Sequence, residues 1–206
     1  MQIINIEQNT PEWLEYRLGK ISGSKLKDII TIRGTEKKVG FYQLAADRLA
    51  LIEETDEQAR DRGHRLEEEA IEELNKKLNK KFISDVGIWV SDKNPDLIVS
   101  PDGGLEDKGK YTKAAEVKCL KAALHIKAFE EQKIPSEYNF QVLQYFIVNE
   151  DLEELYFCLY DPRIKSKPFH YLLVTRQELQ PEIDKWFEYE LNVVKEINEI
   201  VERWAF

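Results

Sequence analysis

Hydrophobic and polar positions alternate along the chain with two different periods, and the changes of period predict its elements. Apolar residues that recur every three or four positions predict amphipathic helices. The expected helices cover Pro11–Leu18, a segment that begins after Ser22 or Ser24, Gly40–Ile52, Asp61–Asn79, Tyr138–Val148 and Gln177–Trp204. Two-residue alternation and short apolar runs predict strands at Lys81–Val90, Leu97–Ser100, Ala114–Leu120, Glu154–Tyr160 and His170–Val174. Helices, then a central mixed β-sheet, then helices again predict an α/β or α+β fold.

Composition narrows the class of protein. With 206 residues, 42% of them hydrophobic, the chain suits one domain over residues 1–206 with a substantial core. No apolar run is long enough to span a membrane and the N-terminus lacks the pattern of a signal peptide, so we expect a cytoplasmic location and no membrane partner. A net charge of −9 argues against a broad basic nucleic-acid surface but leaves room for a local basic groove. Two cysteines, Cys119 and Cys158, are too few for a disulfide framework or a four-thiolate metal centre.

The stretch "VSPDGGLEDKGKYTKAAEVKCL", Val99–Leu120, carries the first candidate site. Asp102 lies in an expected Pro-Gly turn, and strand alternation places Glu116 and Lys118 on one face. One interpretation is an exposed strand face with a surface charge pair. The other is a metal site, in which Asp102 and Glu116 bind a hard cation through oxygen and Lys118 lies beside the reacting group.

Two further polar residues lie on apolar helix faces. Glu67 falls on or beside the predicted buried stripe, while Glu68 and Glu69 are rotated toward solvent. Because a buried charge is costly unless it is paired or bound to metal, Glu67 is interpreted either as a boundary residue that reaches water or as a further metal ligand or water-orienting group. Gln141 lies in the apolar segment "YNFQVLQYFIV". Taken alone, it is interpreted as a buried Gln that hydrogen-bonds a neighbouring backbone group.

"SPDG…EVK" together with the helix Glu is the pattern of the PD-(D/E)xK nucleases, which have a restriction-endonuclease-like core. More specifically, the chain resembles the lambda-type phage exonucleases, the YqaJ-like viral recombinase group. The segments that carry this resemblance are "EWLEYRLGKISGS", "RGHRLEEEA", "YNFQVLQYFIV" and "LYDPR", in order from Trp13 to Arg163. The chain departs from the family at "EQARDRG", where the apolar wedge that parts the duplex is missing, and at Leu120, where the pattern often has Pro.

The resemblance implies a role for each candidate residue. Asp102 and Glu116 would bind the metal together with the Val117 carbonyl, and Lys118 would be the catalytic lysine. Glu67 would be the helix carboxylate, and Gln141 would help to position the attacking water.

Other residues would act at the edge of this site. Asp92 matches a further acidic residue of the family, although "VSDKNPD" also suits a solvated turn. Arg17, Ser24 and Ser100 would hold the terminal 5′-phosphate; the alternative for Arg17 is a helix salt bridge to Glu12 or a neighbour.

The implied activity is a Mg²⁺-dependent deoxyribonuclease, with Mn²⁺ able to substitute. It would be a 5′→3′ exonuclease that degrades one strand of linear double-stranded DNA from a 5′-phosphorylated end and leaves a 3′ overhang for recombination. The family also implies a ring-shaped homotrimer, a single-strand annealing partner and, for a phage-encoded protein, the host cytoplasm. The alternatives are an endonuclease or nickase on the same core and a noncatalytic DNA-end-binding protein, against which the intact Asp, Glu and Lys argue.

Overall fold

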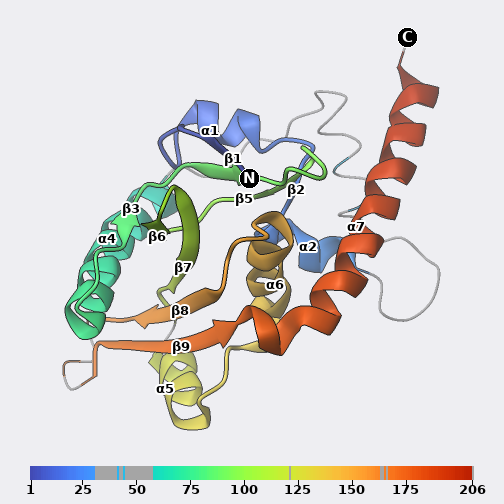
Figure 1. Ribbon diagram of the computed structural model, residues 1–206. Coiled ribbons are helices and arrows are strands. Elements are labelled where there is room, and N and C mark those ends of the chain that lie inside the picture. The colour runs from blue at the N-terminus through green and yellow to red at the C-terminus, as the bar shows by residue number, and fades with distance from the viewer. Residues whose placement is uncertain are drawn as a thin grey trace.

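The computed structural model describes residues 1–30, 41, 44, 58–120, 122–162, 165 and 167–205 (Figure 1). The expected helix at Gly40–Ile52 falls almost wholly outside the described residues. So do Arg163 of the "LYDPR" segment and the side chains of the segment "EQARDRG".

A small sheet is built from the N-terminal part of the chain and two later strands. Its order is β1 (Gln2–Ile4), β4 (Ile88–Val90), β5 (Leu97–Val99) and β2 (Ile21–Ser22). Helix α1 (Pro11–Tyr16) begins as its sequence predicts, because Pro11 is its first residue and the Trp13 amide donates to Thr10 Oγ1 at 3.2 Å. Since β2 and β5 run parallel, the residues that follow them emerge at the same edge of the sheet. After β2 the chain enters helix α2 (Gly23–Ile29).

A larger sheet has the order β3 (Ile83–Ser84), β6 (Gly103–Asp107), β7 (Lys110–Lys118), β8 (Glu154–Tyr160) and β9 (Phe169–Thr175). Strands β7 and β8 are parallel, whereas the other neighbouring pairs are antiparallel. A two-residue turn with positive φ at Lys108 and Gly109 joins β6 to β7. The predicted fold class, a mixed sheet flanked by helices, is confirmed, although the described strands form two sheets where one was expected.

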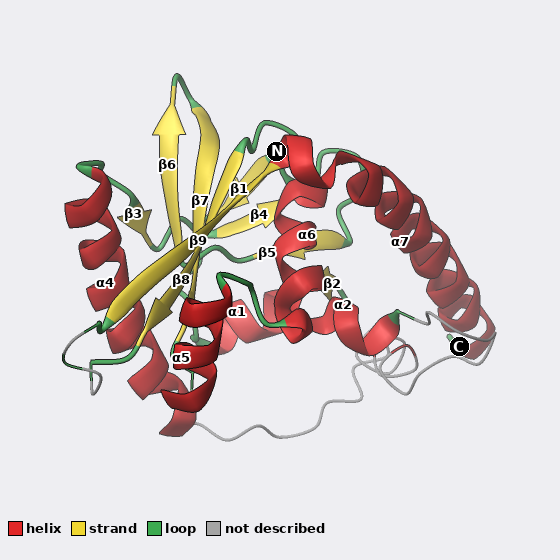
Figure 2. Cartoon of the chain, turned by 90° about the horizontal axis from the view of Figure 1, so that it is seen from below, coloured by secondary structure: helices red, strands yellow, loops and turns green. Residues whose placement is uncertain are grey.

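Helices cover both faces of the larger sheet (Figure 2). On one face, helix α4 (Gln58–Leu78) packs against β7 and β8; on the other lie α6 (Asn139–Val148) and α7 (Arg176–Trp204). Because both faces of the sheet are covered, successive side chains of β7 are buried on opposite faces. Ala115 and Val117 belong to the hydrophobic cluster under α4, and Ala114 belongs to the hydrophobic cluster under α6. Helix α5 (Ala122–Glu131) and the 3₁₀ turn Ser136–Tyr138 connect β7 to α6.

Strand β6 departs from the expected turn, and packing explains why. A Cβ on Gly103 would lie 2.7 Å from Ile71 Cδ1, and one on Gly104 would lie 2.7 Å from Tyr111 Cδ1. The two glycines are therefore strand residues over which neighbouring side chains pack closely. The chain reverses direction further on, at Lys108 and Gly109.

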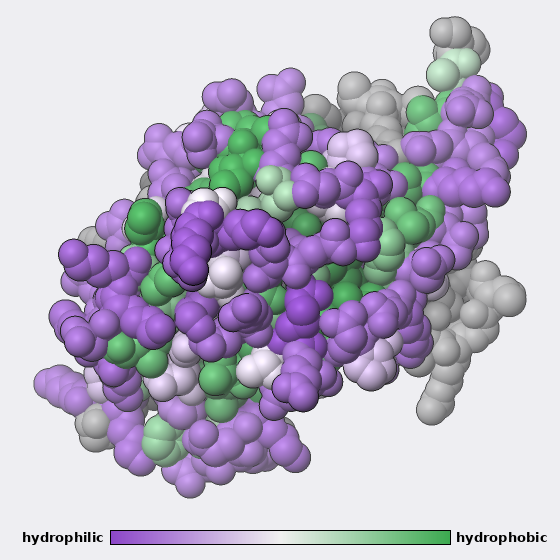
Figure 3. All heavy atoms as spheres, in the orientation of Figure 1, coloured by the Kyte–Doolittle hydropathy of each residue, from purple (hydrophilic) through white to green (hydrophobic). Residues whose placement is uncertain are grey.

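The face of the molecule seen in Figure 3 is mostly hydrophilic, with apolar side chains in small, interrupted groups. In the part of the chain that the structure describes, no helix combines the length and apolar character needed to cross a bilayer.

Candidate active site

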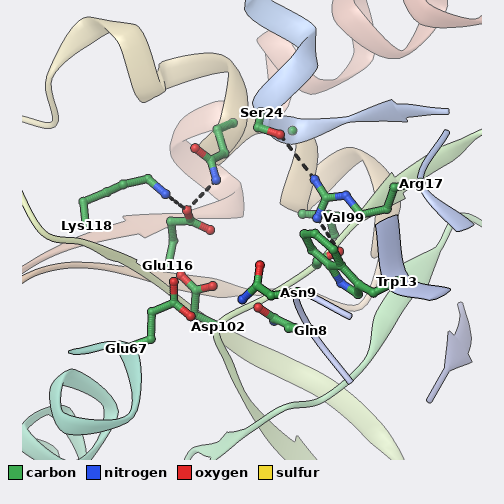
Figure 4. A pocket seen from close by; sticks show the side chains of 13 residues that line it. Gln8, Asn9, Trp13, Arg17, Ser24, Glu67, Val99, Asp102, Glu116 and Lys118 are labelled. Carbon is green, nitrogen blue, oxygen red and sulfur yellow. Dashed lines mark hydrogen bonds and ion pairs between the residues drawn. The ribbon is translucent and has the colours of Figure 1, made fainter. Parts of the chain in front are cut away.

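A cavity of about 130 Å³ lies at the connection between β5 and β6, which joins the two sheets (Figure 4). It gathers residues from α1 and the segments on either side of it, the start of α2, α4, the end of β5, the β5–β6 connection, β7 and α6. Every residue that the sequence nominated lines it except Val117 and Asp92. The lining residues are Gln8, Asn9, Trp13, Arg17, Gly23, Ser24, Glu67, Val99, Ser100, Asp102, Glu116, Lys118 and Gln141.

The Glu116 carboxylate is enclosed in the cavity wall, with its residue only 2% exposed. One of its oxygens accepts from the Lys118 ammonium and from the Gln141 amide, and the other accepts from the Tyr145 hydroxyl. The interpretation as an exposed strand face is therefore wrong. Gln141 also bonds a carboxylate rather than the backbone group that its position alone suggested.

Lys118 stays charged in this surrounding. Burial lowers the pKa of its ammonium, but the Glu116 and Asp102 carboxylates outweigh burial and hold the pKa above its ordinary value. Its Nζ also lies 5.4 Å from the centroid of the Tyr138 ring. The site thus keeps a fixed positive charge beside two carboxylates.

Asp102 is held at the end of the β6–β7 ladder. That ladder ends at the pair of Gly103 with Ala115, and just beyond it the Val117 amide donates to Asp102 Oδ2 at 2.7 Å. Burial raises the pKa of Asp102, and the neighbouring charges of Glu116 and Glu67 raise it further, against the lowering effects of Lys118 and the Val117 amide. A cation between these carboxylates would relieve their mutual repulsion.

Glu67 points from α4 toward Asp102, and the two side chains lie next to each other (Figure 4). Its partial burial, against the exposed Glu68 and Glu69, confirms the helical phase read from the sequence. The position of Glu67 beside the carboxylate pair favours the functional interpretation over that of a boundary residue.

The donor set of this cavity fits a hard divalent cation. Among the described residues, no group of three or more His, Cys, Asp or Glu side chains is gathered closely enough to hold a metal ion on its own. Mg²⁺ in proteins usually takes one or two carboxylates and fills its other positions with water and substrate phosphate. Asp102 and Glu116 offer such oxygens, with Glu67 beside them.

The other end of the cavity is arranged for an anion. Arg17 donates from Nη1 to Ser100 Oγ at 2.8 Å and from Nη2 to Ser24 Oγ at 3.3 Å, and its Cζ lies 4.1 Å from the centroid of the Trp13 ring. These contacts fix the planar guanidinium, whereas the expected alternative, a pair with Glu12, is not among the contacts of the described residues.

The charge of this guanidinium is retained. Burial lowers the pKa of Arg17 to about 10, while the negative groups across the cavity, Glu116 first, oppose that effect. Arg17 is therefore cationic at neutral pH, and its two hydroxyl partners are themselves able to donate to a phosphate.

Asp92, expected from the family resemblance as an accessory acidic residue of the site, does not line the cavity. Its side chain is 63% exposed and pairs with the N-terminal ammonium of Met1. The residue lies in the connection between β4 and β5, as the solvated-turn alternative had it.

Three residues of the site were not predicted from the sequence. Tyr145 lies one helical turn after Gln141, so its presence on the same face of α6 was readable in principle. Gln8 donates from Nε2 to the Pro101 carbonyl at 2.7 Å and so holds the backbone just before Asp102. Asn9 has φ of 63°, a left-handed conformation that Asn tolerates, but nothing in the sequence connects it with this cavity.

Comparison with known proteins gives consistent results. Residues 12–151 match the family model of the YqaJ-like viral recombinase domain. The alkaline exonuclease LHK-Exo from Laribacter hongkongensis matches with a TM-score of 0.77 and 25% identity, over 95% of this chain and 98% of that chain. The structure of LHK-Exo in complex with dAMP matches with a TM-score of 0.76, 24% identity and the same coverage.

A phage related exonuclease from Haemophilus somnus 129PT matches with a TM-score of 0.62 over 90% of this chain and 96% of that chain. At 24% and 13% identity, the second and third of these likenesses are of fold alone. No curated protein matches the chain.

Proposed function

Since this chain belongs to the YqaJ-like viral recombinase family, we propose that it is a Mg²⁺-dependent exonuclease that degrades one strand of linear double-stranded DNA in the 5′→3′ direction. One observation carries the proposal: a carboxylate–lysine group and a fixed arginine with two serines face the same small cavity. The first group suits phosphodiester hydrolysis, and the second suits a terminal phosphate. The solved structures of similar fold that are named as exonucleases support it.

Asp102 and Glu116 are the proposed metal ligands, joined by the Val117 carbonyl and by Glu67 directly or through water. Bound there, Mg²⁺ or its substitute Mn²⁺ would polarise a nonbridging phosphate oxygen, activate a water and neutralise the leaving oxyanion. The Lys118 ammonium stabilises the negative charge that builds up on the phosphate during attack. Gln141 donates to Glu116 and, from the same position, orients the attacking water.

Arg17, Ser24 and Ser100 are proposed to hold the 5′-phosphate of the strand that is degraded. With the terminal phosphate held at one end of the cavity, the bond presented to the carboxylates lies at a fixed distance from the DNA end. That geometry favours release of nucleotides from the end over cutting within a strand, and it leaves a 3′ overhang suited to recombination. The family resemblance supports the further proposals of a ring-shaped homotrimer and a single-strand annealing partner.

A metal titration tests the hydrolytic part of this proposal. Digestion of an end-labelled, 5′-phosphorylated duplex should need added Mg²⁺ or Mn²⁺ and should cease when Glu116→Ala replaces the wild type. Glu68→Gln, on the exposed face of α4, is the matched control and should keep wild-type activity. Cleavage by Glu116→Ala at the wild-type rate would show that the ligands lie elsewhere. DNA-end binding without cleavage at any metal concentration would favour the noncatalytic alternative.

A further inference from the structure

Helix α7 buries a carboxyl group that the proposed chemistry does not use. Glu190 is 0% exposed, and so is Gln144, which faces it from α6. The Gln144 amide Nε2 donates to Glu190 Oε2 at 3.2 Å and to the Ile21 carbonyl at 3.4 Å. The remaining oxygens of the two side chains, Glu190 Oε1 and Gln144 Oε1, have no hydrogen-bond partner.

A single proton shared between these two oxygens would satisfy both. An ionised carboxylate and an amide oxygen only accept hydrogen bonds, so two acceptors would be buried without a donor, at a high cost in free energy. When Glu190 is protonated on Oε1, its hydroxyl can donate to Gln144 Oε1. The carboxylic acid and the amide then form a reciprocal pair with two hydrogen bonds.

The surroundings of Glu190 favour this neutral form. Burial raises the pKa of its carboxyl to about 8, and the hydrogen bond from Gln144 lowers it only in part. One turn away on α7, Trp186, Val193 and Val194 are buried and apolar. From the described residues of β2, α2 and α6, Gln144 is the group that faces this carboxyl, and no charged side chain there adds to the shift.

The pair lies at the point where α6 meets β2 and α2. Gln144 bonds the β2 backbone at Ile21, and it sits one turn after Gln141 and directly before Tyr145, both of which bond Glu116. The two helices approach closely here, because a Cβ on Gly23 would lie 3.1 Å from Gln141 Cγ and 3.2 Å from Gln144 Cβ. A contact that holds α6 at this point therefore also holds Gln141, and with it the Glu116 carboxylate, at a set distance from Ser24 in the cavity.

We propose that Glu190, as a neutral acid paired with Gln144, is a positioning residue that holds α6 against β2 and α2. In this role it sets the spacing between the Glu116 carboxylate and the phosphate-holding Arg17 and Ser24. The inference rests on the proposed function for its effect on DNA ends. The acid–amide pair itself does not depend on that function.

The test combines unfolding curves with end preference, using Glu190→Gln, Glu190→Leu and the exposed control Glu188→Gln. A glutamine at position 190 is neutral at every pH and can both donate to and accept from Gln144. Glu190→Gln should therefore keep the stability and the end preference that Glu190→Leu loses. The folded pKa of about 8 lies above the ordinary 4.5, so the stability that the Glu190 proton provides is complete below pH 4.5 and lost as pH rises toward 8. The melting temperature of the wild type should therefore fall relative to Glu190→Gln between these pH values, by on the order of 10 °C, and level off above.

The ratio of kcat/KM for 5′-phosphorylated over 5′-hydroxyl duplex reports the spacing across the cavity. At neutral pH the ratio in Glu190→Gln should equal that of the wild type. At pH 9 the ratio of the wild type should fall, and that of Glu190→Gln should stay unchanged. In Glu190→Leu the ratio should fall at least tenfold, whereas in Glu188→Gln it should equal that of the wild type at every pH. A merely structural role would lower both rates equally and leave the ratio unchanged.

Two results would overturn the inference: parallel melting curves for the wild type and Glu190→Gln from pH 5 to 9, or an unchanged ratio in a folded Glu190→Leu. If the leucine variant does not fold, the comparison of Glu190→Gln with the wild type decides. A wild type that shows no end preference would refute the proposed phosphate pocket instead, and the melting curves would still decide whether the pair exists.

Discussion

Arg17→Ala is the perturbation that separates recognition of the DNA end from hydrolysis. Arg17 is fixed by Ser100 at 2.8 Å, by Ser24 at 3.3 Å and by the Trp13 ring, and it lies across the cavity from the proposed metal ligands. Removing the guanidinium should therefore weaken the hold on a 5′-phosphate while leaving Asp102 and Glu116 in place.

The expected size of this effect follows from the contact that is lost. A hydrogen bond to a charged group contributes about 1.5–3 kcal/mol, and each 1.4 kcal/mol is a factor of ten, so the preference for 5′-phosphorylated ends should fall roughly 10- to 100-fold. Arg17→Lys should be intermediate, because an ammonium keeps the charge but cannot span both serine hydroxyls. Ser100→Ala should cost more than Ser24→Ala, since its hydroxyl lies closer to the guanidinium.

The assay is single-turnover digestion of a duplex labelled at the 3′ end of the degraded strand, with either a 5′-phosphate or a 5′-hydroxyl. The control is Lys20→Ala, which removes a nearby cation that bonds the Pro95 carbonyl and does not line the cavity. Arg17→Ala should slow digestion of phosphorylated ends only, and Lys20→Ala should change neither rate. An equal loss of rate on both kinds of end in Arg17→Ala, or the same loss in Lys20→Ala, would refute the assignment of Arg17 to the phosphate.

Three other substitutions test separate parts of the account. Lys118→Ala should reduce hydrolysis to background without lowering DNA-end binding, as measured by single-turnover cleavage beside a gel-shift titration; unchanged cleavage would contradict its role. Glu67→Gln should lose activity with little change in melting temperature while Glu69→Gln stays nearly silent, and equal losses in both would refute the helical-phase argument. Gly104→Ala should lower stability by about 1–3 kcal/mol in a urea titration, because its Cβ would lie 2.7 Å from Tyr111 Cδ1; an unchanged midpoint would show that the ring moves aside freely.

The sequence predicted the parts of the site that depend on local periodicity. Strand alternation placed Glu116 and Lys118 on one face, and helical phase separated Glu67 from its exposed neighbours, as the structure has them. The fold class followed in the same way, since β8 (Glu154–Tyr160) and the long C-terminal helix carry strong patterns. In these cases one element alone contains the necessary signal.

Long-range contacts could not be predicted from such patterns. Gly103 and Gly104 suggested a turn because glycine disfavours strands, and the side chains that pack over them come from other elements. The bonds from Gln141 and Tyr145 to Glu116 join α6 to β7, and only the fold brings these two elements together. For Asp92 the family resemblance and the solvated turn were both open from the sequence, and only the structure places the residue in the exposed connection between β4 and β5, away from the cavity.

The most direct test of the central claim compares linear and circular DNA. Wild-type protein is given a 5′-phosphorylated linear duplex and a covalently closed circle in one reaction, with and without Mg²⁺, and the products are resolved with time. The account predicts progressive loss of one strand of the linear duplex from its 5′ end, only with the metal ion, and an intact circle. Nicking or linearisation of the circle at a comparable rate, or degradation that persists after the metal is chelated, would contradict it.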